Sequence, residues 1–218
     1  MFLEHARREV VHTAREISRL GLVQGTAGNV SVRDPETGCV AITPSAVPYD
    51  AMQPDDIVVV NSEGDVVNGP WRPSSETPMH TRVYRHKPWA FGIVHTHSVY
   101  ATTFACLGVE IPAVHYVIAF AGPRIPVANY APYGTDELGE RVVQAMGDGK
   151  AVLLRNHGVL AAGRTVAEAL NIAEVVEYVA TLYYRTRSIG KPLILPDDEI
   201  ERIRLRLEQY RPGEIDRS

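Results

Sequence analysis

Cysteine is scarce in this 218-residue chain, which contains only Cys39 and Cys106. Two cysteines that do not form a CxxC pair are too few for a disulfide framework, so the sequence favours a reducing compartment. No apolar run approaches the length of about 20 residues that a transmembrane helix needs. Charged residues are spread through residues 1–21, which argues against a signal peptide. We therefore expect a cytoplasmic protein with no membrane partner.

A dominant charge is also absent. Lysine and arginine together number 22 and aspartate and glutamate 26, which gives a formal net charge of −4, and charges of one sign do not form a long block. Nothing in this balance indicates a nucleic acid as partner. Because 45% of the residues are hydrophobic, a chain of this length is expected to form one domain, residues 1–218, with a substantial buried core.

Apolar periodicity and turn residues predict helices that alternate with short strands. The N-terminal segment has the spacing of an amphipathic helix that stops at Gly21. Two hairpin patterns follow within residues 26–67. Further helices are predicted over residues 74–86, 98–108, 135–146 and 165–190, and strands over 91–97, near 113–118 and on both sides of a tight turn in 150–163. Residues 197–218 are expected to form a C-terminal helix and tail.

This order of elements favours an α/β fold. Interleaved helices and strands, with hairpins early in the chain, are typical of three α/β/α layers. In such an arrangement helices cover both faces of a central sheet that is mainly antiparallel or mixed.

Three histidines stand out from the apolar segments that contain them. His95 and His97 occupy alternate positions of a predicted strand, so their side chains are expected to share one face. His157 follows the apolar run AVLL and precedes a glycine, at a predicted strand end. The pattern fits a zinc site with three protein ligands and an open position, but separately hydrogen-bonded core histidines fit it as well.

Glu76 lies next to Ser74 and Ser75 at a predicted helix start, where both serines are good N-cap residues. Backbone N–H groups and the helix dipole favour an anion there. Glu76 either has a chemical role or only complements the dipole, and His80, four residues on, could simply pair with it.

Hydroxyl and amide groups gather in residues 26–29, 43–45 and 74–75. Such donors suit a phosphate group, which N–H and O–H groups can hold without much positive charge. Each stretch alone is also an ordinary turn or cap.

The motifs TAGNVSVR, ITPS, PSSETPMH, IVHTHS, IPAVHY, YGT and LLRNHGVLAAG occur in this order along the chain. The ordered set resembles the class II aldolase family, of the L-fuculose-phosphate aldolase type. The likeness runs from the first helix to at least Lys191, and it implies the class II aldolase and adducin-head fold.

The resemblance implies a metal site and a phosphate site. His95, His97 and His157 would hold one Zn²⁺ per subunit, and Glu76 would act as the acid/base and can also ligate the metal when no substrate is bound. The substrate phosphate would be held by residues matching the family's donors, namely Gly28, Asn29, Thr43, Ser45, Ser74 and Ser75.

The reaction implied is retro-aldol cleavage of a ketose 1-phosphate, with L-fuculose 1-phosphate as the first choice. Its products would be dihydroxyacetone phosphate and L-lactaldehyde. The cation would stabilise the negative charge of the ketone fragment, and Glu76 would move the proton at its carbon. Tyr116 and Tyr210 are the candidates for protonating the aldehyde oxygen. A homotetramer with sites between subunits is also implied.

Two departures from the family pattern concern substrate fit. Ala46 stands where many relatives have glycine, and Thr77-Pro78 follows Glu76 where an aromatic or basic residue is frequent. Alternative activities on this fold are a 5-deoxyribulose 1-phosphate aldolase, a methylthioribulose-1-phosphate dehydratase and an L-ribulose-5-phosphate 4-epimerase. A non-catalytic module like the adducin head is disfavoured, because it would be expected to lack the metal ligands that this sequence retains.

Overall fold

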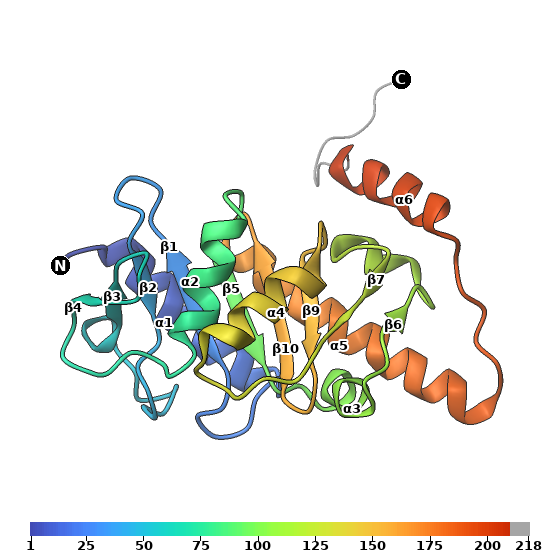
Figure 1. Ribbon diagram of the computed structural model, residues 1–218, viewed down its shortest axis with the longest axis horizontal. Helices are drawn as coiled ribbons and strands as arrows, with labels where there is room; N and C mark the ends of the chain where they lie inside the picture. Colours follow the sequence, from blue (N-terminus) through green and yellow to red (C-terminus); the bar gives the residue numbers. More distant parts are fainter. Residues whose placement is uncertain (210–218) are drawn as a thin grey trace.

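An eight-stranded sheet forms the centre of the computed structural model, which describes residues 1–209 (Figure 1). Neighbouring strands are antiparallel, except that β8 and β9 are parallel. In spatial order the strands are β4 (Val66–Asn68), β3 (Val58–Val60), β2 (Val40–Ile42), β1 (Asn29–Arg33), β5 (Gly92–Thr96), β10 (Gly158–Gly163), β9 (Ala151–Leu154) and β8 (Val127–Ala128). The predicted sheet, mainly antiparallel or mixed, is thus confirmed.

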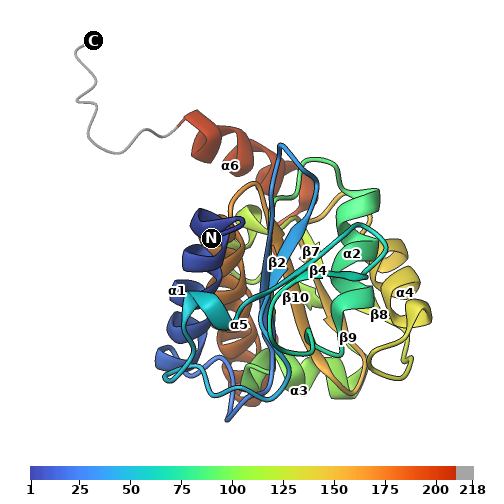
Figure 2. The ribbon, with the colours of Figure 1, turned by 90° about the vertical axis from the view of Figure 1, so that its left-hand side faces the viewer.

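Helices cover both faces of this sheet, as predicted (Figure 2). One layer consists of α1 (Glu4–Arg19), α3 (Val99–Leu107) and α5 (Val166–Ile189). The opposite layer consists of α2 (Thr77–His86) and α4 (Asp136–Met146). Outside these layers lie the small sheet of β6 (Ile111–Pro112) and β7 (Arg124–Ile125), the 3-10 turns η1 (Pro54–Asp56) and η2 (Tyr116–Phe120), and α6 (Asp197–Gln209).

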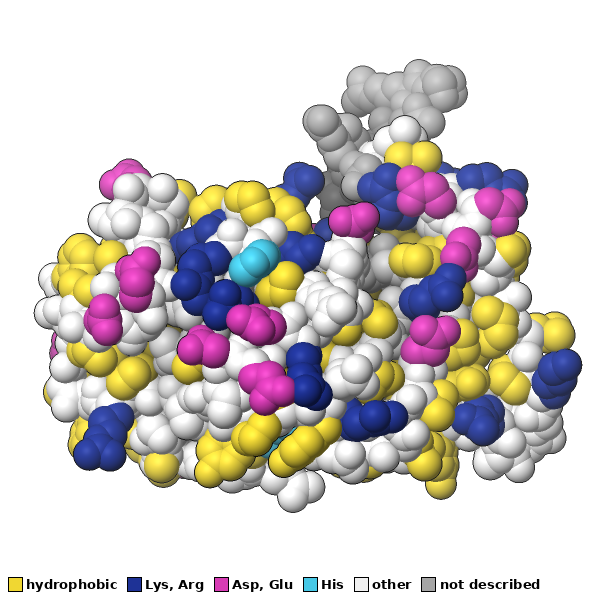
Figure 3. All heavy atoms as spheres, viewed as in Figure 1, with side chains coloured by type: hydrophobic (Ala, Val, Ile, Leu, Met, Phe, Trp, Pro, Cys, Tyr) yellow, Lys and Arg dark blue, Asp and Glu magenta, His cyan; other side chains and the backbone are white. Residues whose placement is uncertain are grey.

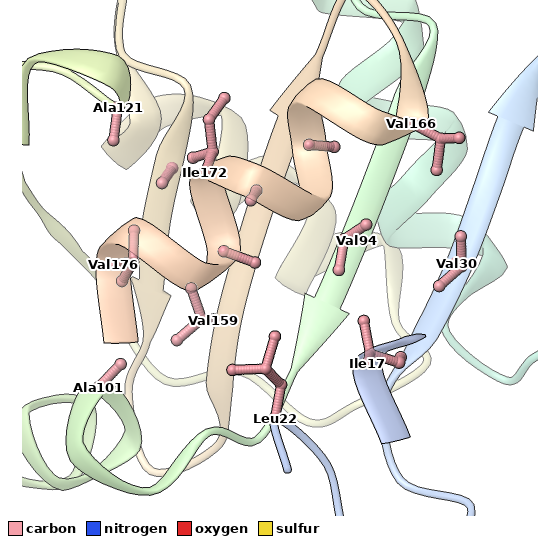
Figure 4. Close-up of a cluster of buried hydrophobic side chains, with 14 of the residues drawn as sticks. Ile17, Leu22, Val30, Val94, Ala101, Ala121, Val159, Val166, Ile172 and Val176 are labelled. Carbon is pink, nitrogen blue, oxygen red and sulfur yellow. The ribbon is translucent and has the colours of Figure 1, made fainter. Parts of the chain in front are cut away.

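Strand alternation divides the hydrophobic core into two parts. Val94 of β5 points into the larger part, which also contains Val30, Val159 and Ile17 and lies between the sheet and helices α1 and α5 (Figure 4). The neighbouring Ile93 belongs to the second part, beneath α2 and α4. Because successive strand residues face opposite sides, His95 lies on the same side as Ile93 and therefore faces the α2 layer.

Two local predictions were wrong. The helix predicted from residue 74 begins at Thr77, and its N-cap is Glu76 instead of a serine. Ser74 donates its backbone N–H to the carbonyl of Thr43, 3.0 Å away, which holds it extended against a neighbouring loop. The strand predicted near residues 113–118 is largely replaced by η2, because the His115 side chain accepts the N–H of Val117 and favours a tight turn.

The strand, turn and strand predicted in residues 150–163 form β9 and β10. The turn between them contains Asn156 in the left-handed region, with φ 56°. Asparagine tolerates this conformation better than most residues. The turn leaves the adjacent His157 at the end of the sheet where β5 also ends.

Positively and negatively charged side chains both occur on the surface. On the face shown in Figure 3, several Lys and Arg side chains lie together beside a His side chain, and Asp and Glu side chains lie next to them. Among residues 1–209, no helix has both the length and the apolar character that crossing a membrane would require.

Gly92 leaves no room for a side chain where α5 packs on the sheet. A Cβ there would lie 2.3 Å from both the backbone nitrogen and the Cα of Val166. We expect Gly92→Ala to force β5 and α5 apart and to lower the free energy of unfolding by roughly 1–3 kcal/mol, measured by chemical denaturation. Gly190→Ala is the control, because a Cβ there meets nothing within 4 Å. Equal unfolding free energies for the two variants would contradict the packing argument.

Candidate metal centre and substrate cavity

Three imidazoles and one carboxylate converge at the end of β5. Glu76, His95, His97 and His157 each offer one ligand atom, and these atoms all lie within 4.8 Å of one another. The three rings are 4.9 to 5.0 Å apart, measured between centroids. His95 and His97 therefore do share one side, as their spacing predicts, and His157 joins them from the β9–β10 turn.

Hydrogen bonding directs His95 into the cluster. This residue is fully buried in β5, and its Nδ1–H donates to the carbonyl oxygen of Val159 on the neighbouring strand β10, at 2.8 Å. Its Nε2 then faces His97 Nε2 at 3.0 Å and Glu76 Oε2 at 3.0 Å. A backbone partner that fixes the tautomer in this way is typical of metal-binding histidines.

The Glu76 carboxylate has one satisfied and one unsatisfied oxygen. Oε2 accepts a hydrogen bond from Asn29 Nδ2 at 2.9 Å. Oε1 is buried, has no hydrogen-bond partner, and lies 3.3 Å from His157 Nε2. A buried carboxylate oxygen without a partner is costly. A divalent cation would satisfy it, and three nitrogens with one oxygen are a ligand set that zinc and related metals accept.

Burial and neighbouring charges shift the pKa values of these groups in opposite directions. Burial raises the pKa of Glu76, but His95, His157 and the Asn29 amide together outweigh it and hold that pKa well below its ordinary value. Burial likewise lowers the pKa of His95, yet the adjacent Glu76 carboxylate leaves it raised overall. Glu76 is therefore an anion that can only accept hydrogen bonds.

The two other imidazoles are kept neutral. Burial, together with the charge of His95, lowers the pKa of both His97 and His157 to about 4. Neutral imidazoles present the lone pairs that metal ligation requires.

A cavity of about 350 Å³ opens beside this cluster. Five of the six residues predicted to hold a phosphate line it, namely Gly28, Asn29, Ser45, Ser74 and Ser75. The loops that supply the serines are joined, because Pro44 and Pro73 form a β-bridge and the backbone N–H of Ser45 donates to Arg72 O. Serines from two distant segments thus line one cavity.

Gly28 brings the first loop close to the cluster of Glu76 and the three histidines. Its φ is +78°, and a Cβ would lie 2.6 Å from the carbonyl oxygen of His95, so only glycine fits. The hydroxyl of Tyr49 donates to the carbonyl oxygens of Gly28 and Ala27, at 2.7 and 3.0 Å. The loop is therefore held against the strand that carries two of the histidines.

Three of the predicted phosphate donors have other partners. The hydroxyl of Ser74 accepts the backbone N–H of Glu76 at 3.3 Å. Thr43 is buried and is not among the residues lining the cavity, and its hydroxyl accepts the backbone N–H of Val30 at 3.3 Å. The Asn29 amide bonds to Glu76 at one end and to His80 at the other. Ala46, which lines the cavity, has φ 61°, a conformation that costs a residue with a Cβ about 1–2 kcal/mol.

Of the two predicted tyrosines, the structure describes only Tyr116. Tyr116, in η2, is 50% exposed and is not among the residues lining the cavity. Tyr210 lies outside the described residues. Instead Tyr130 and Tyr133 line the cavity, although sequence reasoning gave them no role. In the sequence, Tyr133 lies in the YGT motif, whereas Tyr130 lies in none of the motifs named above.

Glu177 also helps to position the site, although the sequence analysis gives it no role. From α5 its carboxylate accepts the backbone N–H groups of Tyr100 and Ala101, each at 2.9 Å. These groups begin α3 directly after the segment containing His97. The contact restrains the chain just after β5, the strand that contains His95. In the sequence, the available indication was a carboxylate in a largely apolar part of the helix.

Comparison with known proteins identifies the family to which the chain belongs. The family model described as Class II Aldolase and Adducin N-terminal domain matches residues 8–184. A 5-deoxy-D-ribulose 1-phosphate aldolase from Bacillus thuringiensis is 43% identical over 210 residues, which cover 96% of this chain and 99% of that protein. An L-fuculose phosphate aldolase from Escherichia coli is 41% identical over 205 residues, covering 93% of this chain and 94% of that protein.

A solved structure of an L-fuculose 1-phosphate aldolase superimposes with a TM-score of 0.91 at 41% identity, covering 94% of this chain and 96% of that one. The fold implied by the sequence motifs is thus confirmed. The relatives that match nearly the whole length of this chain are named as aldolases. This chain therefore belongs to the class II aldolase and adducin N-terminal domain family and is an enzyme of the aldolase type, a lyase.

Proposed function

We propose that this enzyme cleaves a ketose 1-phosphate by a metal-dependent retro-aldol reaction, giving dihydroxyacetone phosphate and an aldehyde. The observation that carries the proposal is the juxtaposition of the four-group cluster with a cavity lined by Ser45, Ser74 and Ser75. A phosphate held by these hydroxyls would set the ketose carbon chain beside Glu76.

His95, His97 and His157 would hold the cation, which we propose to be one zinc ion per subunit. The unsatisfied Oε1 of Glu76 and the neutral imidazoles support this choice. When bound, the ion would supply Lewis-acid stabilisation of the negative charge that develops on the ketone fragment.

Glu76 is proposed to move the proton at carbon. Cleavage breaks the bond between C3 and C4, the 4-hydroxyl loses its proton to become the aldehyde, and C3 of the ketone fragment must gain one. An ionised carboxylate that lies at the cavity wall is suited to carry that proton. Because Asn29 retains Oε2, Oε1 is the oxygen available for the transfer.

L-fuculose 1-phosphate is the first substrate that we propose, with L-lactaldehyde as its aldehyde product. A second candidate is 5-deoxyribulose 1-phosphate, because a relative named for a 5-deoxy-D-ribulose 1-phosphate activity is 43% identical to this chain. Both sugars share the ketose 1-phosphate end that the serine-lined cavity would hold, and they differ only at the aldehyde end.

A homotetramer with sites between subunits remains a prediction. The half-exposed ring of Tyr116, outside its own chain's cavity, would suit a role at a neighbouring site. The phosphorylated substrate and two free cysteines, Cys39 and Cys106, support the proposal of a cytoplasmic enzyme.

A substrate panel tests the proposed reaction. We expect the zinc-loaded enzyme to release dihydroxyacetone phosphate from L-fuculose 1-phosphate or 5-deoxyribulose 1-phosphate, with the higher kcat/KM identifying the better substrate. Methylthioribulose 1-phosphate and L-ribulose 5-phosphate are the comparison substrates. Dehydration or epimerisation of these, with no dihydroxyacetone phosphate from any sugar, would overturn the aldolase proposal.

The variant His97→Ala tests the metal ligands. Loss of a residue that hydrogen-bonds to a metal ligand lowers metal affinity by roughly 10- to 100-fold, and loss of the ligand His97 itself should lower zinc affinity by more than that. Cleavage should be abolished, while circular dichroism shows an intact fold. His5→Ala is the control, since the His5 side chain is 89% exposed on α1. Undiminished zinc content and activity in His97→Ala would refute the ligand set.

Ser75→Ala tests the phosphate site. A hydrogen bond to a charged group contributes about 1.5–3 kcal/mol, so KM for the phosphorylated substrate should rise roughly tenfold or more, with a smaller change in kcat. Ser62→Ala, in an exposed turn between β3 and β4, provides the comparison. A KM equal to that of Ser62→Ala would exclude Ser75 as a phosphate donor.

A further inference from the structure

A chain of buried polar side chains leads from Glu76 into the protein interior. Asn29 and Ser31 come from β1, and His80 and Tyr84 come from α2, so the chain runs between the sheet and that helix. Each of these four side chains belongs to a residue that is at most 4% exposed. They interrupt the apolar packing beneath α2, where polar groups are costly unless they are bonded.

The contacts along this chain are continuous. Asn29 Nδ2 lies 2.9 Å from Glu76 Oε2, and Asn29 Oδ1 lies 2.5 Å from His80 Nε2. His80 Nδ1 lies 2.7 Å from Ser31 Oγ. The Tyr84 hydroxyl lies 2.8 Å from Ser31 Oγ and 3.0 Å from the Ser31 carbonyl oxygen. We refer to Asn29, His80, Ser31 and Tyr84 as the His80 relay.

The negative charge of Glu76 determines the direction of the first two hydrogen bonds. An ionised carboxylate only accepts, so the amide nitrogen of Asn29 must face it. The amide oxygen is thereby turned toward His80 and requires a donor. His80 must therefore carry a proton on Nε2, because the opposite amide orientation would place two acceptors, Asn29 Oδ1 and Glu76 Oε2, against each other.

The other ring nitrogen of His80 is an acceptor. Burial, with the nearby charge of His95, lowers the pKa of His80 to about 3, so the ring is neutral. With Nε2 protonated, Nδ1 accepts the hydroxyl proton of Ser31. The Tyr84 hydroxyl must then be the donor of its 2.8 Å contact with Ser31 Oγ, and the Ser31 carbonyl oxygen, 3.0 Å away, also lies within its reach.

We propose that His80 is a positioning residue for the reaction: its Nε2–H fixes the Asn29 amide so that the amide holds Oε2 of Glu76. The carboxylate is thereby anchored at one oxygen, while Oε1 stays directed at the metal ligands and the cavity. This inference rests on the proposed function for its catalytic consequence. It also gives Asn29 a task that differs from phosphate binding.

Substitution at His80 separates positioning from packing. Glutamine extends an amide donor to about the place of Nε2, whereas leucine fills the space without a donor. We expect His80→Leu to lower kcat by roughly 10- to 100-fold, to change KM by less than about threefold, and to weaken zinc binding by roughly 10- to 100-fold, as loss of an outer partner does. His80→Gln should recover most of both properties.

The matched control is Thr81→Val. Thr81 is also buried in α2, and its hydroxyl bonds only within that helix, to Thr77 O and Pro78 O. It should retain the wild-type kcat and zinc affinity. If His80→Leu behaves like Thr81→Val, or if His80→Gln is as impaired as His80→Leu, the positioning role is overturned.

Nitrogen-15 NMR of labelled histidines provides a test that needs no substrate. The ring of His80 should be neutral and protonated at Nε2 from about pH 5 to about pH 9, a range in which an ordinary imidazole titrates. A ring protonated at Nδ1 would overturn the inference even if His80→Leu fails to fold. If the wild-type enzyme cleaves no ketose phosphate but His80 has this tautomer and His80→Leu loses zinc affinity, the proposed function fails while the relay stands.

Discussion

A single buried carboxylate constrains the architecture of this enzyme. Placing the negative charge of Glu76 away from water is unfavourable unless donors and cations surround it. Here the surroundings are His95, His157 and the Asn29 amide, which together hold the pKa of Glu76 low. These groups come from separate parts of the chain. The fold must therefore bring α2, β1, β5 and the β9–β10 turn to one point.

Strand register achieves this convergence. Asn29 of β1 pairs with His95 of β5, and His95 pairs with Leu160 of β10, so three adjacent strands are in register beside Glu76 and the three histidines. Alternation then directs His95 and Ile93 toward α2 and Val94 toward α5. The same β5 strand thereby contributes to the site and to both parts of the core, and a one-residue slip would reverse all of these directions.

The sequence predicts what depends on short spacing. The shared side of His95 and His97, the turn before His157, and the helices on both faces of the sheet follow from local pattern. The use of Glu76 as N-cap and the partners of Thr43 depend on contacts between distant segments. The 3-10 turn at residues 116–120 depends on a local side-chain contact, from the N–H of Val117 to His115, that apolar spacing does not reveal. His80 illustrates the limit: its spacing from Glu76 suggests a direct pair, but β1 inserts Asn29 between them.

The charge of Glu76 explains the row of buried polar side chains beneath α2. Apolar residues at these positions would pack without needing partners, and buried polar networks stabilise a fold only when every member is bonded. The hydrogen bonds of the His80 relay all donate toward Glu76, because the carboxylate at its end can only accept. An ionised Glu76 thus orders the protons of residues inside the core, and the ordered row holds Glu76 in place. The site and the α2 layer of the core are consequently one hydrogen-bonded unit.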